Sequence, residues 1–312
     1  MSRIAFGGVI ITLFILTLFL FSQAVPGSDM GLCLPSPNQW HFLRFPGWLI
    51  NTALAVLSAV IINAANKKYN FIPGSEHVLP MALLLLLACS PLSTATLSTS
   101  TLLLFWNVLC LFIIISTYEE RNATREFFIV GTLPAIGAMF QYAFLLMIPV
   151  YVGGGLLMKS FRIREFIAFV FGLITPYWIV IGLGIISPFS FHLPESLIIF
   201  NRGAVDSDIF LTLLSVGIMG LIGFILSLYN SVKLFSRNSR LRCMHTTFNL
   251  MGLVAVLAVI FDFTNFMAYL GTLALWVAIQ LATLLHFYHI RRPQWALLLL
   301  LAIFLPIYIL AL

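Results

Sequence analysis

The chain is organised by long apolar runs separated by short polar segments. Runs of about 17 to 25 residues, the length needed to cross the hydrocarbon core of a bilayer, recur from one end to the other. Windows of about 19 residues predict an all-α fold, a polytopic transmembrane bundle of eleven helices. They are expected at residues 4–21, 46–63, 78–94, 101–117, 127–140, 142–158, 166–186, 209–229, 247–261, 266–286 and 295–310.

Two of these segments allow a second interpretation. Residues 127–158 form a largely apolar stretch of 32 residues, too long for one span and short for two. We predict a tight helical hairpin that turns near Gln141, since basic clusters on both flanks require an even number of crossings. The first segment also resembles a cleavable signal peptide, but its run of about 18 residues exceeds the usual apolar region of about 7 to 15, which favours a retained helix.

Lysine and arginine alternate between the connecting segments. One side receives only Arg44 and Arg202, and the other receives 14 of the 16 cations. By the positive-inside rule, we expect a cytoplasmic N-terminus and an external C-terminus. Residues 1–312 are interpreted as a single integral domain of the inner membrane, with long external loops at about residues 23–45 and 187–208.

Composition agrees with this interpretation. Apolar residues make up 61% of the chain and charged residues 8%, against about 45–50% and about 25% in soluble domains. The protein is therefore expected to contact the lipid bilayer. A net charge of +6 does not indicate a nucleic-acid partner, because the cations lie in short clusters beside apolar runs. The four cysteines lack metal-ligand spacing, which supports neither a disulfide scaffold nor a zinc site.

The predicted external face holds half of the ten acids. They are Asp29, Glu195, Asp206, Asp208 and Asp262. Any polar site is therefore expected to face outward.

The segment from Arg202 to Asp208 concentrates charge just before a predicted span. One explanation is helix capping, in which Asp or Ser accepts hydrogen bonds from unpaired N–H groups. Capping requires only one of these residues. The other explanation is that Asp206 and Asp208 bind a divalent cation while Arg202 binds a phosphate oxygen. Capping is favoured, and the site remains the alternative.

Polar residues inside the spans are rare. Asp262 is the only charge between residues 246 and 285, and we expect an exposed acid at a tight external turn. If it lies deeper, an intramembrane acid becomes a candidate functional residue. The other polar residues are expected to bond neighbouring helices, as is usual, rather than to form a transport pathway. They are Asn107, Gln141, Asn249 and Gln280.

Two resemblances carry further expectations. The order of "TYEERNATREFF", a Gly/Pro hairpin and "KSFRIREFIAFVFGLITPYWIV" resembles an integral membrane family of unknown function from Bacteroidota. That resemblance centres on residues 118–180 and implies no activity.

More distantly, the chain is similar to the GT-C class of polyprenyl-phosphate-dependent glycosyltransferases, which have a long first external loop with an essential acid. The chain departs from that class in lacking an acidic pair directly after the first span. The similarity implies Asp29 as the catalytic base and a polyprenyl-phosphate lipid as donor. It further implies substrate contacts from His41, Arg44, Arg202 and Asp262, and a divalent cation at Asp206 and Asp208.

Three functions follow from these patterns. The favoured one is a non-enzymatic subunit that supports cell-envelope assembly or lipid-linked processes through membrane-protein partners. The first alternative is a GT-C-like glycosyltransferase acting on the external face. A transporter or lipid flippase ranks last, because the spans contain almost no ionisable residues.

Overall fold

A computed structural model describes residues 3–20, 32–37, 40, 44–73, 77–187, 207–234, 238–288 and 294–310. Its helices are α1 (Arg3–Leu20), α2 (Arg44–Tyr69), α3 (Val78–Ala88), α4 (Pro91–Thr94), α5 (Thr99–Ser116), α6 (Thr124–Phe140), η2 (Tyr142–Met147), α7 (Ile148–Leu157), α8 (Ile163–Gly182), α9 (Ser207–Leu234), α10 (Ser239–Phe261), η3 (Phe263–Tyr269), α11 (Leu270–Phe287) and α12 (Gln294–Leu310). Each of the eleven predicted spans contains a helix, so the predicted helical bundle is confirmed.

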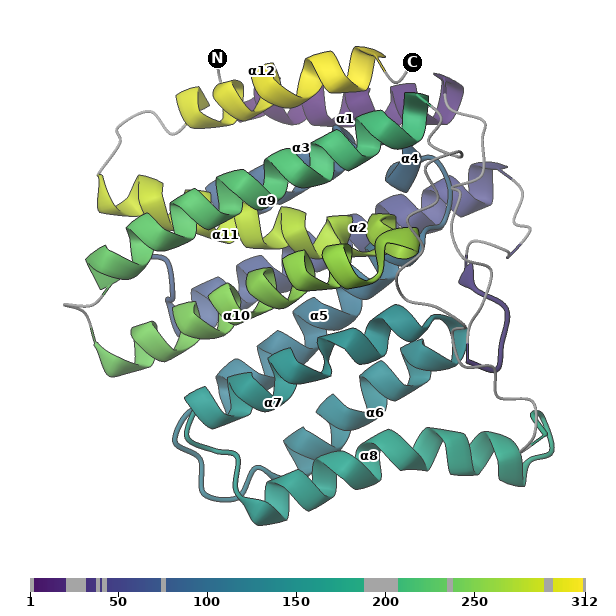
Figure 1. Ribbon diagram of the computed structural model, residues 1–312. Helices are drawn as coiled ribbons and strands as arrows, with labels where there is room; N and C mark the ends of the chain where they lie inside the picture. The colour runs from purple at the N-terminus through teal and green to yellow at the C-terminus, as the bar shows by residue number, and fades with distance from the viewer. Residues whose placement is uncertain are drawn as a thin grey trace.

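The helices lie roughly side by side across the molecule. α12 and α1 form one edge, α8 forms the other, and α5, α10 and α11 lie between them (Figure 1). In the candidate span Asn265–Phe287, which contains α11, 94% of an 18-residue apolar window is buried. In α8 the corresponding share is 28%. α11 is therefore enclosed by protein, and the edge helices present apolar side chains outward.

The exposed surface of the bundle is apolar along the helices. Trp178, Leu221 and Leu299 are 76%, 65% and 62% exposed. Exposed apolar surface on this scale is unusual for a soluble protein. Six of the described helices are long and apolar enough to cross a membrane. The protein is a multi-pass membrane protein whose outer helix faces contact lipid.

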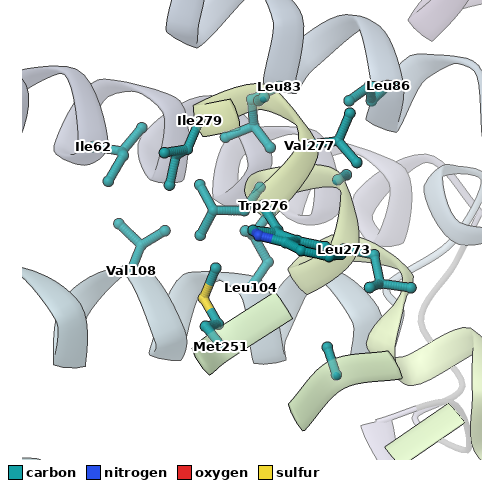
Figure 2. Packing of buried hydrophobic residues seen from close by; sticks show 14 of the residues in the cluster. Ile62, Leu83, Leu86, Leu104, Val108, Met251, Leu273, Trp276, Val277 and Ile279 are labelled. Carbon is teal, nitrogen blue, oxygen red and sulfur yellow. The ribbon is translucent and has the colours of Figure 1, made fainter. Parts of the chain in front are cut away.

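Four helices pack around α11, namely α3, α5, α9 and α10. In Figure 2, Trp276 of α11 lies among side chains contributed by α2, α3, α5 and α10. The labelled residues are Ile62, Leu83, Leu86, Leu104, Val108, Met251, Leu273, Trp276, Val277 and Ile279. α11 is buried on most of its circumference, which is why its sequence is mainly apolar, with a few polar residues such as Thr272 and Gln280.

One end of the bundle carries ten of the twelve described cations and is called the basic end. It is defined by Lys67, Lys68, Arg121, Arg125, Lys159, Arg162, Arg164, Lys233, Arg240 and Arg242. The other end is called the opposite end. The positive-inside rule predicts that the basic end is cytoplasmic.

Contacts between connecting segments agree with the predicted alternation. At the basic end, Lys159 Nζ lies 2.9 Å from Glu119 Oε1, which joins the α5–α6 connection to the α7–α8 connection. The hydrogen bond from Lys159 holds the pKa of Glu119 below its ordinary value, and it raises the pKa of Lys159. At the opposite end, the Leu34 amide donates to the Met139 carbonyl at 2.9 Å. Each contact joins segments that the charge pattern places on the same side.

The predicted hairpin at Gln141 is confirmed. Gln141 has extended backbone angles (φ −155°, ψ 120°), so α6 ends there and η2 begins at the next residue. Close helix packing accompanies the turn, because a Cβ on Gly131 would lie 2.3 Å from the Phe169 carbonyl oxygen of α8. No side chain fits at such a distance, and the glycine lets the two backbones touch.

Candidate functional site

Asp262 lies inside the bundle and not on an exposed turn. Its side chain is 0% exposed, so the expectation of an exposed turn acid is wrong. The reason is the shape of the connection: α10 ends at Phe261, and the chain continues as the 3-10 segment η3 before α11 begins. The turn is folded against η2 and α5 instead of projecting from the membrane.

Both carboxylate oxygens of Asp262 accept hydrogen bonds. The Tyr142 hydroxyl donates to Oδ1 at 2.5 Å, and the Tyr269 hydroxyl donates to Oδ2 at 2.7 Å. Asn265 Nδ2 also donates to Oδ1, at 2.9 Å. A buried carboxylate is tolerated only when such donors replace water. The three bonds therefore explain how the bundle accommodates this acid.

The same bonds connect two interrupted helices. Asn265 Oδ1 accepts from Gln141 Nε2 at 3.2 Å, and Asn265 Nδ2 also contacts the Tyr142 hydroxyl. We call Gln141, Tyr142, Asp262, Asn265 and Tyr269 the Asp262 network. Gln141 and Tyr142 lie at the break between α6 and α7, and the other three lie at the break between α10 and α11. The network holds the two breaks together.

A second polar cluster surrounds Asn51 of α2. Asn51 Nδ2 donates to the Ser93 carbonyl at 2.9 Å, and its Oδ1 accepts from the Ser98 amide at 3.4 Å. Oδ1 also accepts from the Thr101 hydroxyl. These bonds fasten the α3–α4–α5 connection to α2. Sequence reasoning missed this cluster, although the Ser/Thr-rich stretch "CSPLSTATLSTST" was a signal that could have revealed it.

Asn107, Asn249 and Gln280 bond neighbouring helices, as predicted. Asn107 Nδ2 of α5 donates to Thr272 Oγ1 of α11 at 2.8 Å, and Tyr151 of α7 donates to Asn107 Oδ1 at 2.5 Å. Gln280 Nε2 of α11 donates to Asn249 Oδ1 of α10 at 2.6 Å. The polar groups thus join α5, α7, α10 and α11.

Most other candidate site residues are not placed. Asp29, His41, Arg202 and Asp206 lie outside the described residues. Arg44 begins α2.

Asp208 is the second residue of α9, whose start at Ser207 agrees with a helix beginning at the charged segment. The far ends of α2 and α9 carry Lys68 and Lys233, so both helices begin at the opposite end, where the Asp262 network also lies. The side chains of Arg44 and Asp208 are not described, so capping and cation binding both remain predictions.

The Asp262 network can accept hydrogen bonds and fix backbone geometry. Its carboxylate is enclosed by the protein, with no exposed surface. Among the residues that the structure describes, no three His, Cys, Asp or Glu side chains are grouped to hold a metal ion. No known protein family, curated protein or solved structure matches this chain.

Proposed function

We propose that this multi-pass membrane protein is a non-enzymatic subunit that supports cell-envelope assembly or lipid-linked processes in the inner membrane. The observation that carries the proposal is the burial and hydrogen bonding of Asp262. It is the one candidate site residue whose side chain is described, and it is fully buried with both oxygens hydrogen-bonded. A carboxylate in this position stabilises the shape of the bundle and is not presented to a substrate.

The other buried polar groups support the same function. The Asn51 cluster and the bond between Asn107 and Thr272 both connect one helix to another. A transporter needs polar groups along a pathway to the midplane, whereas a scaffold needs them where helices must keep a fixed arrangement. The described contacts join one helix to another, which supports the scaffold.

The test compares external acids with the buried acid in cells that encode the protein. The chromosomal copy is replaced by Asp29→Asn, by a double variant Asp206→Asn with Asp208→Asn, or by Asp262→Ala. The readouts are resistance of the envelope to detergent and the set of proteins that crosslink to the tagged chain in mild detergent.

A non-enzymatic subunit predicts that the Asp29→Asn and Asp206/Asp208 variants keep both resistance and the crosslinked partners. Asp262→Ala is expected to lose both, because the bundle is weakened. Loss of resistance in Asp29→Asn with unchanged protein level and partners would replace the proposal with an enzyme. The absence of any reproducible partner would also refute it.

A further inference from the structure

A shallow groove lies between α6 and α8 at the basic end of the bundle. α8 forms an edge of the molecule and packs against α6 (Figure 1). The groove has a volume of 550 Å³, within the range of about 300–1,000 Å³ typical of ligand sites. Its apolar walls include Phe128, Ile167 and Phe171, which are 36%, 49% and 61% exposed. Because these walls belong to outer helix faces, the groove opens to the hydrocarbon of the membrane.

α6 and α8 run in the same direction, so both of their N-termini lie at the basic end. Each helix begins there, and α7 returns the chain between them. Glycine lets the two backbones touch, because a Cβ on Gly172 would lie 2.2 Å from the Phe128 carbonyl oxygen. A helix N-terminus is equivalent to about half a positive charge. Two such partial charges therefore lie at the same end of the groove.

Two arginines add full charges at this place. Arg125 and Arg164 are the second residues of α6 and α8, both are exposed, and both line the groove. The helix dipole disfavours a cation in the first turn, and an acidic partner would offset that cost. Among the described residues, neither arginine has an acidic partner or a hydrogen bond. Arg240, in the first turn of α10, differs because it stacks on Tyr69 and Tyr118.

The neighbouring acids do not neutralise the groove. Glu126 and Glu165 each follow one of the arginines in sequence, and neither lines the groove. Glu165 is 1% exposed, and its Oε2 accepts from the Arg162 amide at 3.3 Å. Thr124 does line the groove, and its hydroxyl oxygen is buried without a hydrogen-bond partner in the described part of the chain. The basic end of the groove thus offers a hydroxyl and two guanidinium groups, which are donors suited to phosphate oxygens.

The depth of these groups in the membrane matches a phospholipid. α8 has 20 residues, about 30 Å at a rise of about 1.5 Å per residue, which is the thickness of the hydrocarbon core. Arg164 therefore lies at the level of the headgroups. Phe171 lies roughly 10 Å deeper, within a single leaflet of about 15 Å. A soluble phosphate would contact only the arginines, whereas a phospholipid would also cover the apolar walls.

We propose that the α6–α8 groove binds an anionic phospholipid from the leaflet at the basic end. The headgroup phosphate lies between Arg125 and Arg164, and one acyl chain lies along Phe128, Ile167 and Phe171. The inference goes beyond the proposed function and does not depend on it, since both a scaffold and an enzyme could hold such a lipid.

The test uses the full chain, one copy per nanodisc, with phospholipids whose acyl chains are brominated and quench nearby tryptophan. Phe171→Trp places a reporter on the groove wall, and its signal is the difference from the unmodified chain, which has six tryptophans. Brominated phosphatidylglycerol is compared with brominated phosphatidylcholine at equal mole fractions. We expect phosphatidylglycerol to quench the reporter at a several-fold lower mole fraction. Arg125→Gln and Arg164→Gln should each reduce this preference about fivefold, the effect of one basic side chain near an anionic lipid.

Matched controls separate the groove from the general charge of the basic end. Arg242→Gln removes an exposed cation from the same end, on α10, and should leave the preference unchanged. Leu228 of α9 is 56% exposed and lies at a comparable depth, so a Leu228→Trp reporter should not respond to Arg125→Gln. Inorganic phosphate in excess should not displace the phospholipid, because it leaves the apolar walls uncovered.

Four results would overturn the inference. The first is equal quenching of the groove reporter by the two lipids. The second is a preference that Arg125→Gln and Arg164→Gln change no more than Arg242→Gln does, which would make the arginines topology signals only. The third is displacement by inorganic phosphate, which would assign the arginines to a soluble anion. The fourth is loss of quenching when two copies share a nanodisc, which would assign the groove to a second copy of the chain.

The arginine variants change exposed side chains, so their thermal transitions should stay near that of the unmodified protein. If Phe171→Trp does not fold, native mass spectrometry of the chain without the reporter counts the phospholipids that stay bound. Retention of phosphatidylglycerol over phosphatidylcholine, lost in Arg125→Gln and Arg164→Gln, would support the inference. Equal retention of the two lipids would overturn it.

Discussion

Removing the carboxylate of Asp262 should be among the most destabilising single changes in this bundle. In Asp262→Ala, the hydroxyls of Tyr142 and Tyr269 lose the carboxylate as acceptor inside the bundle, whereas the amide of Asn265 keeps the Tyr142 hydroxyl as its acceptor. A buried donor left unsatisfied costs about 1–3 kcal/mol. Taking the low end for two donors, since the loss of a buried charge offsets part of the cost, the free energy of unfolding should fall by about 2 kcal/mol.

Two milder variants divide this effect into its parts. Asp262→Asn keeps one carbonyl oxygen as an acceptor, and its new amide can donate to a tyrosine hydroxyl, so we expect a loss of about 1 kcal/mol. Tyr269→Phe removes one donor and leaves the others in place. The free energy of unfolding should fall by about 1 kcal/mol, a typical net contribution of one hydrogen bond.

Unfolding can be followed by titration with SDS in mixed micelles, using a thiol-reactive dye as the probe. Cys89 and Cys110 are 2% and 0% exposed, so they react only when the core opens. Glu120→Ala, which removes an exposed acid at the basic end, is the control and should change nothing. The reasoning is refuted if Asp262→Ala matches this control. If Asp262→Asn is as damaging as Asp262→Ala, the negative charge and not the number of acceptors holds the network.

Three further predictions concern other parts of the molecule. Gly252→Ala places a methyl group 2.0 Å from a Trp276 ring atom, and this overpacking should cost about 1–3 kcal/mol, seen as a lower SDS midpoint and a shifted tryptophan emission. Asn51→Ala leaves the buried Ser98 amide without its acceptor, whereas the Thr101 hydroxyl keeps the Ser98 carbonyl, and the change should cost about 1 kcal/mol in the same titration. Lys159→Gln should raise the pKa of Glu119 toward its ordinary value, because the hydrogen bond that lowers it is removed; carboxyl carbon NMR measures this. Any stability that Glu119 contributes is present above its unfolded-state pKa and is lost as pH falls through the lowered folded-state pKa.

The helices were predictable because the signals that define them are local. Apolar run length located a helix in each predicted segment, and alternating charge predicted the turn at Gln141. The burial of Asp262 was not predictable in this way. An acid between two apolar runs gives the same pattern whether the turn projects or folds inward. One of the partners of the buried acid, Tyr142, lies 120 residues away in sequence, where no local pattern indicates it. The Asn51 cluster was not predicted for a related reason, since its partners are weakly polar Ser and Thr residues and backbone groups.

The central position of α11 has a consequence for biogenesis. α11 contacts α3, α5, α9 and α10, all of which are synthesised before it. Those helices must therefore enter the bilayer while the surface that α11 later covers is still exposed. Lipid or an insertion factor covers this surface until α11 is inserted. A ribosome that stalls before Leu270 would release a chain without α11, in which this surface stays exposed. Membrane quality control would recognise such a chain by the polar residues that α11 normally satisfies, including Asn107 and Asn249.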